Sequence, residues 1–118
     1  MPTIRELVAA LRERDGVEAA VLLGRDGLVI DAANALPAAD TDAIAALVPA
    51  VVGSADALGH QSGRGALLTA ILEHEGGIAV VSVLTPDAVL LVMMRESAHV
   101  GPLLFELRRS RQHLASLV

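Results

Sequence analysis

The sequence contains no cysteine, lysine, tryptophan or tyrosine, and its one aromatic residue is Phe105. The absence of cysteine excludes a disulfide framework, a thiolate zinc site and thiol catalysis. Without lysine, the chain has no P-loop ammonium group, no Schiff-base amine and no lysine general base. A single aromatic side chain also does not make a stacking platform for single-stranded nucleic acid. These absences remove several classes of enzyme and of nucleic-acid-binding protein.

Positive charge is also scarce. The nine basic residues are all arginine, and fourteen acidic residues give a formal net charge of −5. A phosphate backbone is a poor partner for such a chain, so we expect no nucleic-acid partner. Apolar residues make up 53% of the 118 residues. That share is too high for a disordered chain, and the length predicts one domain over residues 1–118.

Long uncharged runs are missing too. The longest, Ala43–Ala55, is shorter than the roughly 20 residues that a helix needs to cross a bilayer. Charged residues from Arg5 onward interrupt the N-terminal segment, so it does not have the apolar core of a signal peptide. We therefore expect no membrane insertion and a cytoplasmic location.

The first part of the chain predicts a helix followed by a β-hairpin. Apolar residues recur at helical spacing over Ile4–Asp15, and Gly16 stands where a left-handed cap would end that helix. Two apolar runs, Val17–Leu23 and Leu28–Ala33, flank an Asp-Gly pair that is a strong hairpin signal. Because neither run alternates cleanly, we expect the hairpin to be covered on both faces.

A second helix, expected over Thr41–Gly59, has three distinct faces. Large apolar residues form the stripe that we expect to face the core: Ile44, Leu47, Val48, Val51, Val52, Ala55 and Leu58. Small residues form another stripe: Ala43, Ala46, Ala50, Gly53 and Ala57. The remaining face, expected to meet water, carries Asp42, Ala45, Pro49, Asp56 and His60. Small side chains let a second helix approach closely, and no other helix offers a complementary stripe, so we predict a homodimer through this helix.

The second half predicts three strands and a helix. Gly59–Gly65 is expected to be a flexible connector, and the strands are expected over Ala66–His74, Ile78–Leu84 and Val89–Met94. Their short joints force antiparallel pairing. A last helix is expected from Ser97 or His99 to Leu117.

The predicted order is therefore α-β-β-α-β-β-β-α. Five antiparallel strands that are apolar on both faces need helices on both faces, and three helices are available. The predicted fold class is α/β (α+β), a three-layer α/β/α sandwich around a five-stranded antiparallel sheet.

No catalytic or metal-binding constellation stands out. The four histidines lack the spacing of a metal site, and the serines lack a nucleophile elbow. Gly59–Gly65 has neither the lysine nor the following helix of a phosphate loop. Glu73 and Glu75 share a strand face, but solvated charge explains them better than an acid pair. We expect no enzyme activity, no metal and no cofactor, and keep an enzyme of unknown type as the third hypothesis.

Three segments, taken in order, resemble the Roadblock family, the group of the dynein light chain Roadblock. Gly16–Ile30 is similar to the first hairpin of that family, and Leu58–Gly65 is similar to the exit from its second helix. Val89–Met94 followed by His99–Leu104 resembles its last strand and the start of its last helix. Gly24 departs from the pattern, because many members carry an acidic residue there.

The resemblance implies a Roadblock, profilin-like sandwich that is usually a homodimer or heterodimer. It also implies that the strand Ala66–His74 pairs with its copy and continues the sheet across the dimer, which adds Leu68, Ala70 and Leu72 to the predicted dimer interface. The partners that it implies are Ras-like small GTPases or scaffolds that carry them, with no nucleotide bound by the chain itself. Its bacterial branch includes MglB-like activators of a polarity GTPase.

The leading hypothesis is a non-catalytic dimeric regulator or scaffold of a Ras-like small GTPase, with MglB-like activation as a more specific form. Asp56, His60 and Arg64 are the candidate partner-binding residues. Arg64, on the glycine-rich connector, is the arginine whose position would suit an arginine finger inserted into the GTPase. The resemblance instead favours a regulator that holds the GTPase's own catalytic residues in place. The alternative hypothesis is a pure dimerisation adaptor in a motor or sensor-kinase signalling complex.

Overall fold

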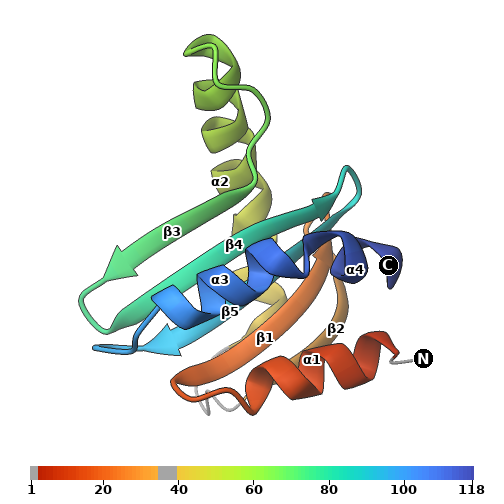
Figure 1. Cartoon of the computed structure of the whole chain (residues 1–118), viewed down its shortest axis with the longest axis vertical. Coiled ribbons are helices and arrows are strands. Elements are labelled where there is room, and N and C mark those ends of the chain that lie inside the picture. The colour runs from red at the N-terminus through yellow and green to blue at the C-terminus, as the bar shows by residue number, and fades with distance from the viewer. Residues whose placement is uncertain (1–2, 35–39) are drawn as a thin grey trace.

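The computed structural model describes residues 3–34 and 40–118 (Figure 1). One five-stranded antiparallel sheet has the order β2-β1-β5-β4-β3. The predicted fold class and strand order along the chain are confirmed, and the last helix is divided in two. The elements are α1 (Ile4–Arg12), β1 (Val17–Gly24), β2 (Val29–Asn34), α2 (Thr41–Gln61), β3 (Thr69–His74), β4 (Gly77–Thr85), β5 (Ala88–Arg95), α3 (Gly101–Arg109) and α4 (Arg111–Ser116).

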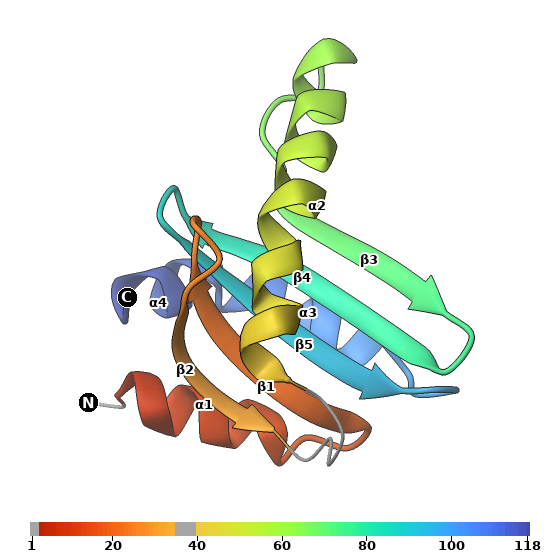
Figure 2. The same cartoon turned by 180° about the vertical axis from the view of Figure 1, so that it is seen from behind.

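Helices cover both faces of the sheet, as Figures 1 and 2 show from opposite sides. On one face, α1, α3 and α4 contribute Val8, Leu107 and Leu114 to a buried cluster with the strands. On the other face, α2 contributes Val48 and Val52 to a second buried cluster. Because the central strands send alternate side chains into the two clusters, they are apolar on both faces.

The two edge strands are less covered than the sequence indicated. Ile30 on β2 is 52% exposed and Ile71 on β3 is 49% exposed, whereas β1, β4 and β5 are largely buried. The expectation that both strands of the first hairpin are covered on both faces is therefore wrong for β2. Edge strands lie at the limits of the helical layers, so part of their apolar surface stays open.

Several element boundaries differ from the prediction. α1 ends at Arg12 with Glu13 as its C-cap, so Gly16 is not its cap. Gly16 instead has a φ of +85° in the turn before β1, where a Cβ would lie 2.9 Å from the Cβ of Ala98. β3 begins at Thr69 rather than at residue 66, and α2 continues to Gln61.

The predicted last helix breaks at Ser110. α3 ends at Arg109 and α4 starts at Arg111. The break places the guanidinium of Arg111 against the β3–β4 pair, where it donates to the carbonyls of Val83 (2.9 Å) and Leu68 (3.3 Å). The same side chain donates to the hydroxyl of Thr69 at 3.0 Å. Such long-range side-chain contacts leave no trace in the hydrophobic periodicity of the sequence, so the break at Ser110 was not predicted.

The orientation of α2 about its axis is also different from the prediction. Ala45, expected in water, is fully buried, whereas Leu47 and Leu58, expected in the core, are each 70% exposed. The reason is the close approach of the β1–β2 turn. A Cβ on Gly27, whose φ is +89°, would lie 3.1 Å from Cγ of Pro49 on the helix. The helix therefore turns a small residue toward the sheet and leaves larger ones outside.

Candidate functional site: the outer face of α2 and the edge of β3

The outer face of α2 is an uncovered apolar surface. All five residues of the predicted small stripe are exposed: Ala43, Ala46, Ala50, Gly53 and Ala57. A Cβ built on Gly53 would meet nothing within 4 Å. The side chains of Leu47 and Leu58 on the same helix are also exposed, so large and small apolar residues are open to solvent together. We call these seven residues the α2 outer face.

The apolar character of α2 extends over its full length. By length and composition alone, Thr41–Gln61 could cross a membrane, although no uncharged run of that length occurs. Just 17% of its apolar window is buried in the protomer, and those residues are Ala45, Val48 and Val52. A helix of this kind exposes apolar surface of a sort that is typical of interaction sites.

The edge of β3 lies next to this helix. β3 is the last strand of the sheet, and within the described chain it pairs with β4 alone. Ala70 and Leu72 are half-buried on the side of α2, whereas Leu68 precedes the strand and is 59% exposed. Figure 2 shows the C-terminal turns of α2 projecting beyond the sheet on the side of β3. The structure thus brings the predicted interface residues of both segments to one side of the protomer.

Asp56 and His60 lie on the projecting part of α2. One carboxylate oxygen of Asp56 accepts a hydrogen bond of 2.7 Å from the backbone N–H of Leu67. The other lies 3.5 Å from Nε2 of His60, whose side chain is 59% exposed. Asp56 therefore has a structural contact that its position on the helix did not reveal, and His60 is the more accessible of the two.

The connector after α2 is held by hydrogen bonds, so the expectation of a flexible segment is corrected. The backbone N–H of Arg64 donates to the carbonyl of Gly59 at 2.7 Å, and that of Gly65 donates to the same oxygen at 3.1 Å. A Cβ on Gly59 would collide with the carbonyl of Gly65, and Gly63 and Gly65 have positive φ. The glycines at these positions therefore allow the chain to turn back closely against the end of α2.

Arg64 is exposed on this return. Its guanidinium donates to the carbonyl of Ser62 at 3.0 Å, so the side chain lies along its own connector. The geometry gives it a surface position. In the described parts of the chain, no group of three or more metal-ligating side chains could hold a metal ion.

Sequence reasoning missed Leu47 and Leu58 as surface residues. The prediction that Val48 and Val52 face the core is confirmed, but the third buried residue of the helix is Ala45, whereas the large side chains of Leu47 and Leu58 gave a stronger apolar signal. Whether Ala45 or Leu47 faces the sheet depends on how the β1–β2 turn packs against the helix, which is a contact between distant segments.

The chain belongs to the Roadblock/LC7 domain family, because the model of that family matches residues 3–94. Solved structures of similar fold include the gliding protein MglB of Thermus thermophilus, which is 23% identical with a TM-score of 0.81 and covers 95% of this chain and 85% of that one. MglB of Myxococcus xanthus is 16% identical with a TM-score of 0.84, covering 98% and 97%.

A further solved structure is described as MglB with a tetrameric arrangement. It is 23% identical to this chain with a TM-score of 0.82, covering 95% of this chain and 85% of that one. At these identities the three likenesses show the shared fold. The resemblance to the Roadblock family that the sequence indicated is confirmed.

Proposed function

We propose that this chain is a non-catalytic regulator or scaffold of a Ras-like small GTPase that acts in the cytoplasm as a homodimer. The observation that carries the proposal is the exposed α2 outer face beside the open edge of β3, in a chain of the Roadblock/LC7 family. The whole chain, residues 1–118, is then one Roadblock domain.

The dimer is supported by the shape of the surface. The small residues of the α2 outer face let another helix approach closely, and the neighbouring leucines offer side chains to pack beside it. An unpaired strand edge next to an apolar helix is an aggregation hazard unless it is covered. A second copy of the chain covers both at once, because a two-fold interface places the same patch of each protomer against the other.

The family supports the proposal of a GTPase partner. The likeness to MglB shows that the fold is shared and agrees with this proposal. Two copies of α2 with their adjoining connectors would make a composite surface that neither protomer has alone. His60 and Arg64 would lie on this surface near the projecting end of each helix. We propose that the GTPase binds there and that MglB-like activation, where it occurs, uses the partner's own catalytic residues.

The dimer is tested by light scattering with size-exclusion chromatography on the wild-type chain and on Ala50→Arg. The added side chain places a charge in the small stripe, so we expect a monomer or a precipitate. Ala9→Arg is the matched control, because Ala9 is an exposed alanine of α1 on the other face of the sheet. A dimer of unchanged stability in Ala50→Arg contradicts the proposed interface.

The GTPase is tested by titration with a purified Ras-like GTPase, loaded with GDP or with a GTP analogue. We expect the wild-type chain and Ala9→Arg to bind, and Ala50→Arg to lose binding. A stable dimer that binds neither nucleotide state of the GTPase would favour the adaptor hypothesis instead.

A further inference from the structure

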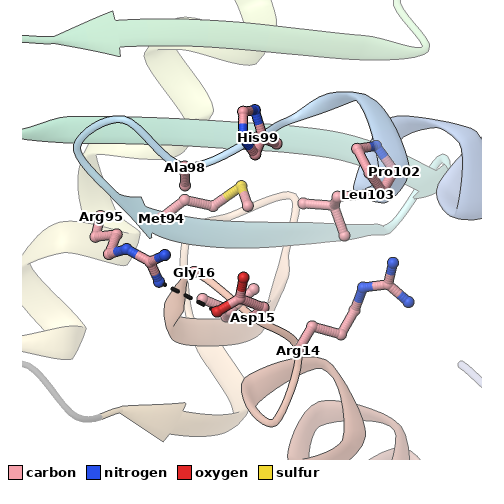
Figure 3. Close-up of a pocket in the computed structure, with 10 residues that line it drawn as sticks. Arg14, Asp15, Gly16, Met94, Arg95, Ala98, His99, Pro102 and Leu103 are labelled. Atoms are coloured by element: carbon pink, nitrogen blue, oxygen red, sulfur yellow. Dashed lines mark hydrogen bonds and ion pairs between the residues drawn. The ribbon is translucent and has the colours of Figure 1, made fainter.

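A pocket of about 310 Å³ lies on the face of the sheet that α1 and α3 cover, which is the face opposite to α2. It is formed by the turn between α1 and β1, the end of β5 and the segment that leads into α3 (Figure 3). None of its lining residues belongs to α2 or β3. One protomer therefore completes the pocket without a second copy.

The floor of the pocket is apolar and fixed. Val17, Met94 and Leu103 line it, and each is at most 5% exposed. Gly16 sets the distance between the two walls, since a Cβ there would lie 2.9 Å from the Cβ of Ala98. The backbone N–H of Arg95 donates to the carbonyl of Gly16 at 2.9 Å and ties the walls together. The cavity is thus part of the folded framework.

The rim of the pocket carries an excess of positive charge. Figure 3 shows Arg95 directed toward Asp15 on one side, and Arg14 extending on the other side near Pro102 and Leu103. The Arg95–Asp15 distance is 3.4 Å, and both side chains are largely exposed, so this pair is weak. In the described part of the chain, the guanidinium of Arg14 has no hydrogen-bond or ion-pair partner.

We propose that this pocket binds a small organic anion with an apolar body, its carboxylate on Arg14 and its carbon chain on Met94 and Leu103, with Arg95 adding positive charge at the opposite side of the rim. The lining of the pocket includes two guanidinium groups and the one carboxylate of Asp15, which leaves a net positive site on a chain whose overall charge is −5. The volume lies at the lower end of the range for small-molecule pockets, which suits a body of a few carbons.

This site goes beyond the proposed GTPase function and does not depend on the dimer. The same chemistry could be supplied by a free short-chain carboxylic acid or by the terminal carboxylate of a polypeptide that ends in an apolar residue. Both place one negative charge beside an apolar group. The experiment has one arm for each source.

The experiment follows methyl signals by NMR during titration with hexanoate, 1-hexanol or hexylammonium. These probes share the carbon chain and differ in the charge of the head group. We expect hexanoate to shift the methyl signals of Met94 and Leu103 saturably, with affinity at least tenfold above that for the other two probes. Met93 packs against the cluster on the α2 side, so its methyl signal should stay unchanged as an internal control.

Matched variants locate the anion. Arg14→Ala combined with Arg95→Ala should weaken hexanoate binding by at least tenfold. Arg108→Ala combined with Arg109→Ala removes the same charge from α3 outside the pocket and should change the affinity less than twofold. If the first pair unfolds the chain, Arg14→Gln keeps the size of the side chain and should still lower the affinity.

The second arm titrates acetyl-Ala-Leu as the free acid and as the amide. Tighter binding of the free acid than of hexanoate assigns the site to a chain terminus, and the reverse order assigns it to a free acid. Ala50→Arg, as a soluble monomer, should bind either probe like the wild-type chain, and Ala9→Arg serves in its place where Ala50→Arg precipitates, so the outcome is separable from that of the dimer. The proposal is overturned if neither carboxylate shifts Met94 saturably, if hexylammonium binds equally well, or if the arginine variants keep full affinity.

Discussion

The carboxylate of Asp56 in α2 accepts a 2.7 Å hydrogen bond from the backbone N–H of Leu67, eleven residues later in the chain. Between these two residues the chain leaves α2, turns through its glycines and enters the edge of the sheet. The bond therefore fixes the position of β3 relative to the projecting end of α2. Together with the backbone hydrogen bonds from Arg64 and Gly65 to Gly59, it sets the relative position of the two parts of the proposed dimer surface.

Asp56→Ala should lower the free energy of unfolding by about 1–2 kcal/mol, because the half-buried N–H of Leu67 loses its charged acceptor. It should also weaken the proposed dimer, since one of the contacts that hold β3 beside α2 is lost. Urea denaturation and sedimentation measure the two effects. Asp56→Asn keeps an oxygen acceptor and should retain most of the stability. Equal losses in both variants would show that the charge matters and the hydrogen bond does not.

Arg111→Ala should lower the free energy of unfolding by about 1.5–3 kcal/mol, because one guanidinium bonds to two carbonyls and a hydroxyl of the β3–β4 pair. Hydrogen exchange should quicken at the amide of Val83, which donates to Leu68 at the start of that edge. Arg108→Ala, an exposed arginine of α3, should change the stability by less than about 0.5 kcal/mol. Unchanged exchange at Val83 in Arg111→Ala would contradict the role of Arg111 as a clamp.

Ser82→Ala should raise the free energy of unfolding by about 1 kcal/mol. Ser82 is 1% exposed, and within the described chain its hydroxyl has no hydrogen-bond partner. Removing a buried hydroxyl that lacks a partner removes a desolvation cost and leaves the methylene packing in place. Ser54→Ala, an exposed serine on α2, is the comparison and should be close to neutral. A loss of stability in Ser82→Ala would mean that the hydroxyl is bonded in solution.

Arg64→Ala should reduce any activation of a bound GTPase modestly, with binding retained. Arg64 is exposed and lies along its own connector, bonded to the carbonyl of Ser62. An inserted arginine finger would contribute a factor of about 10³–10⁵ to the rate, and its removal would abolish that gain. Single-turnover GTP hydrolysis with saturating regulator distinguishes the two cases. A loss of several hundredfold at unchanged affinity would identify Arg64 as a finger.

Sequence reasoning worked where local pattern and tertiary structure agree. The antiparallel pairing of consecutive strands was predicted from the short joints between them. The burial of both faces of the strands Val17–Gly24 and Ala88–Arg95 was predicted from their continuous apolar runs. The exposure of the small residues on α2 was also predicted, because they form a stripe of their own. In each of these cases the residues of one segment carry the information.

The failures have one physical cause, namely contacts between distant segments. The rotation of α2 depends on Gly27 approaching Pro49, and the break at Ser110 coincides with the contacts of Arg111 to Val83 and Leu68. The ordered connector depends on backbone bonds to Gly59. The pocket could not be foreseen at all, because Arg14 and Arg95 reach the same pocket only through the pairing of β1 with β5.

The irregularity of β2 has a consequence for how far assembly can proceed. β2 forms the sheet edge opposite to β3, and its register with β1 shifts between Leu22 and Leu23. If two protomers join through β3, the two β2 strands become the outer limits of the shared sheet. A bulged strand that also carries Asp31 and Asn34 is a poor template for another strand. Growth by strand addition would therefore stop at two copies, which favours a closed particle of fixed stoichiometry over an open-ended fibre.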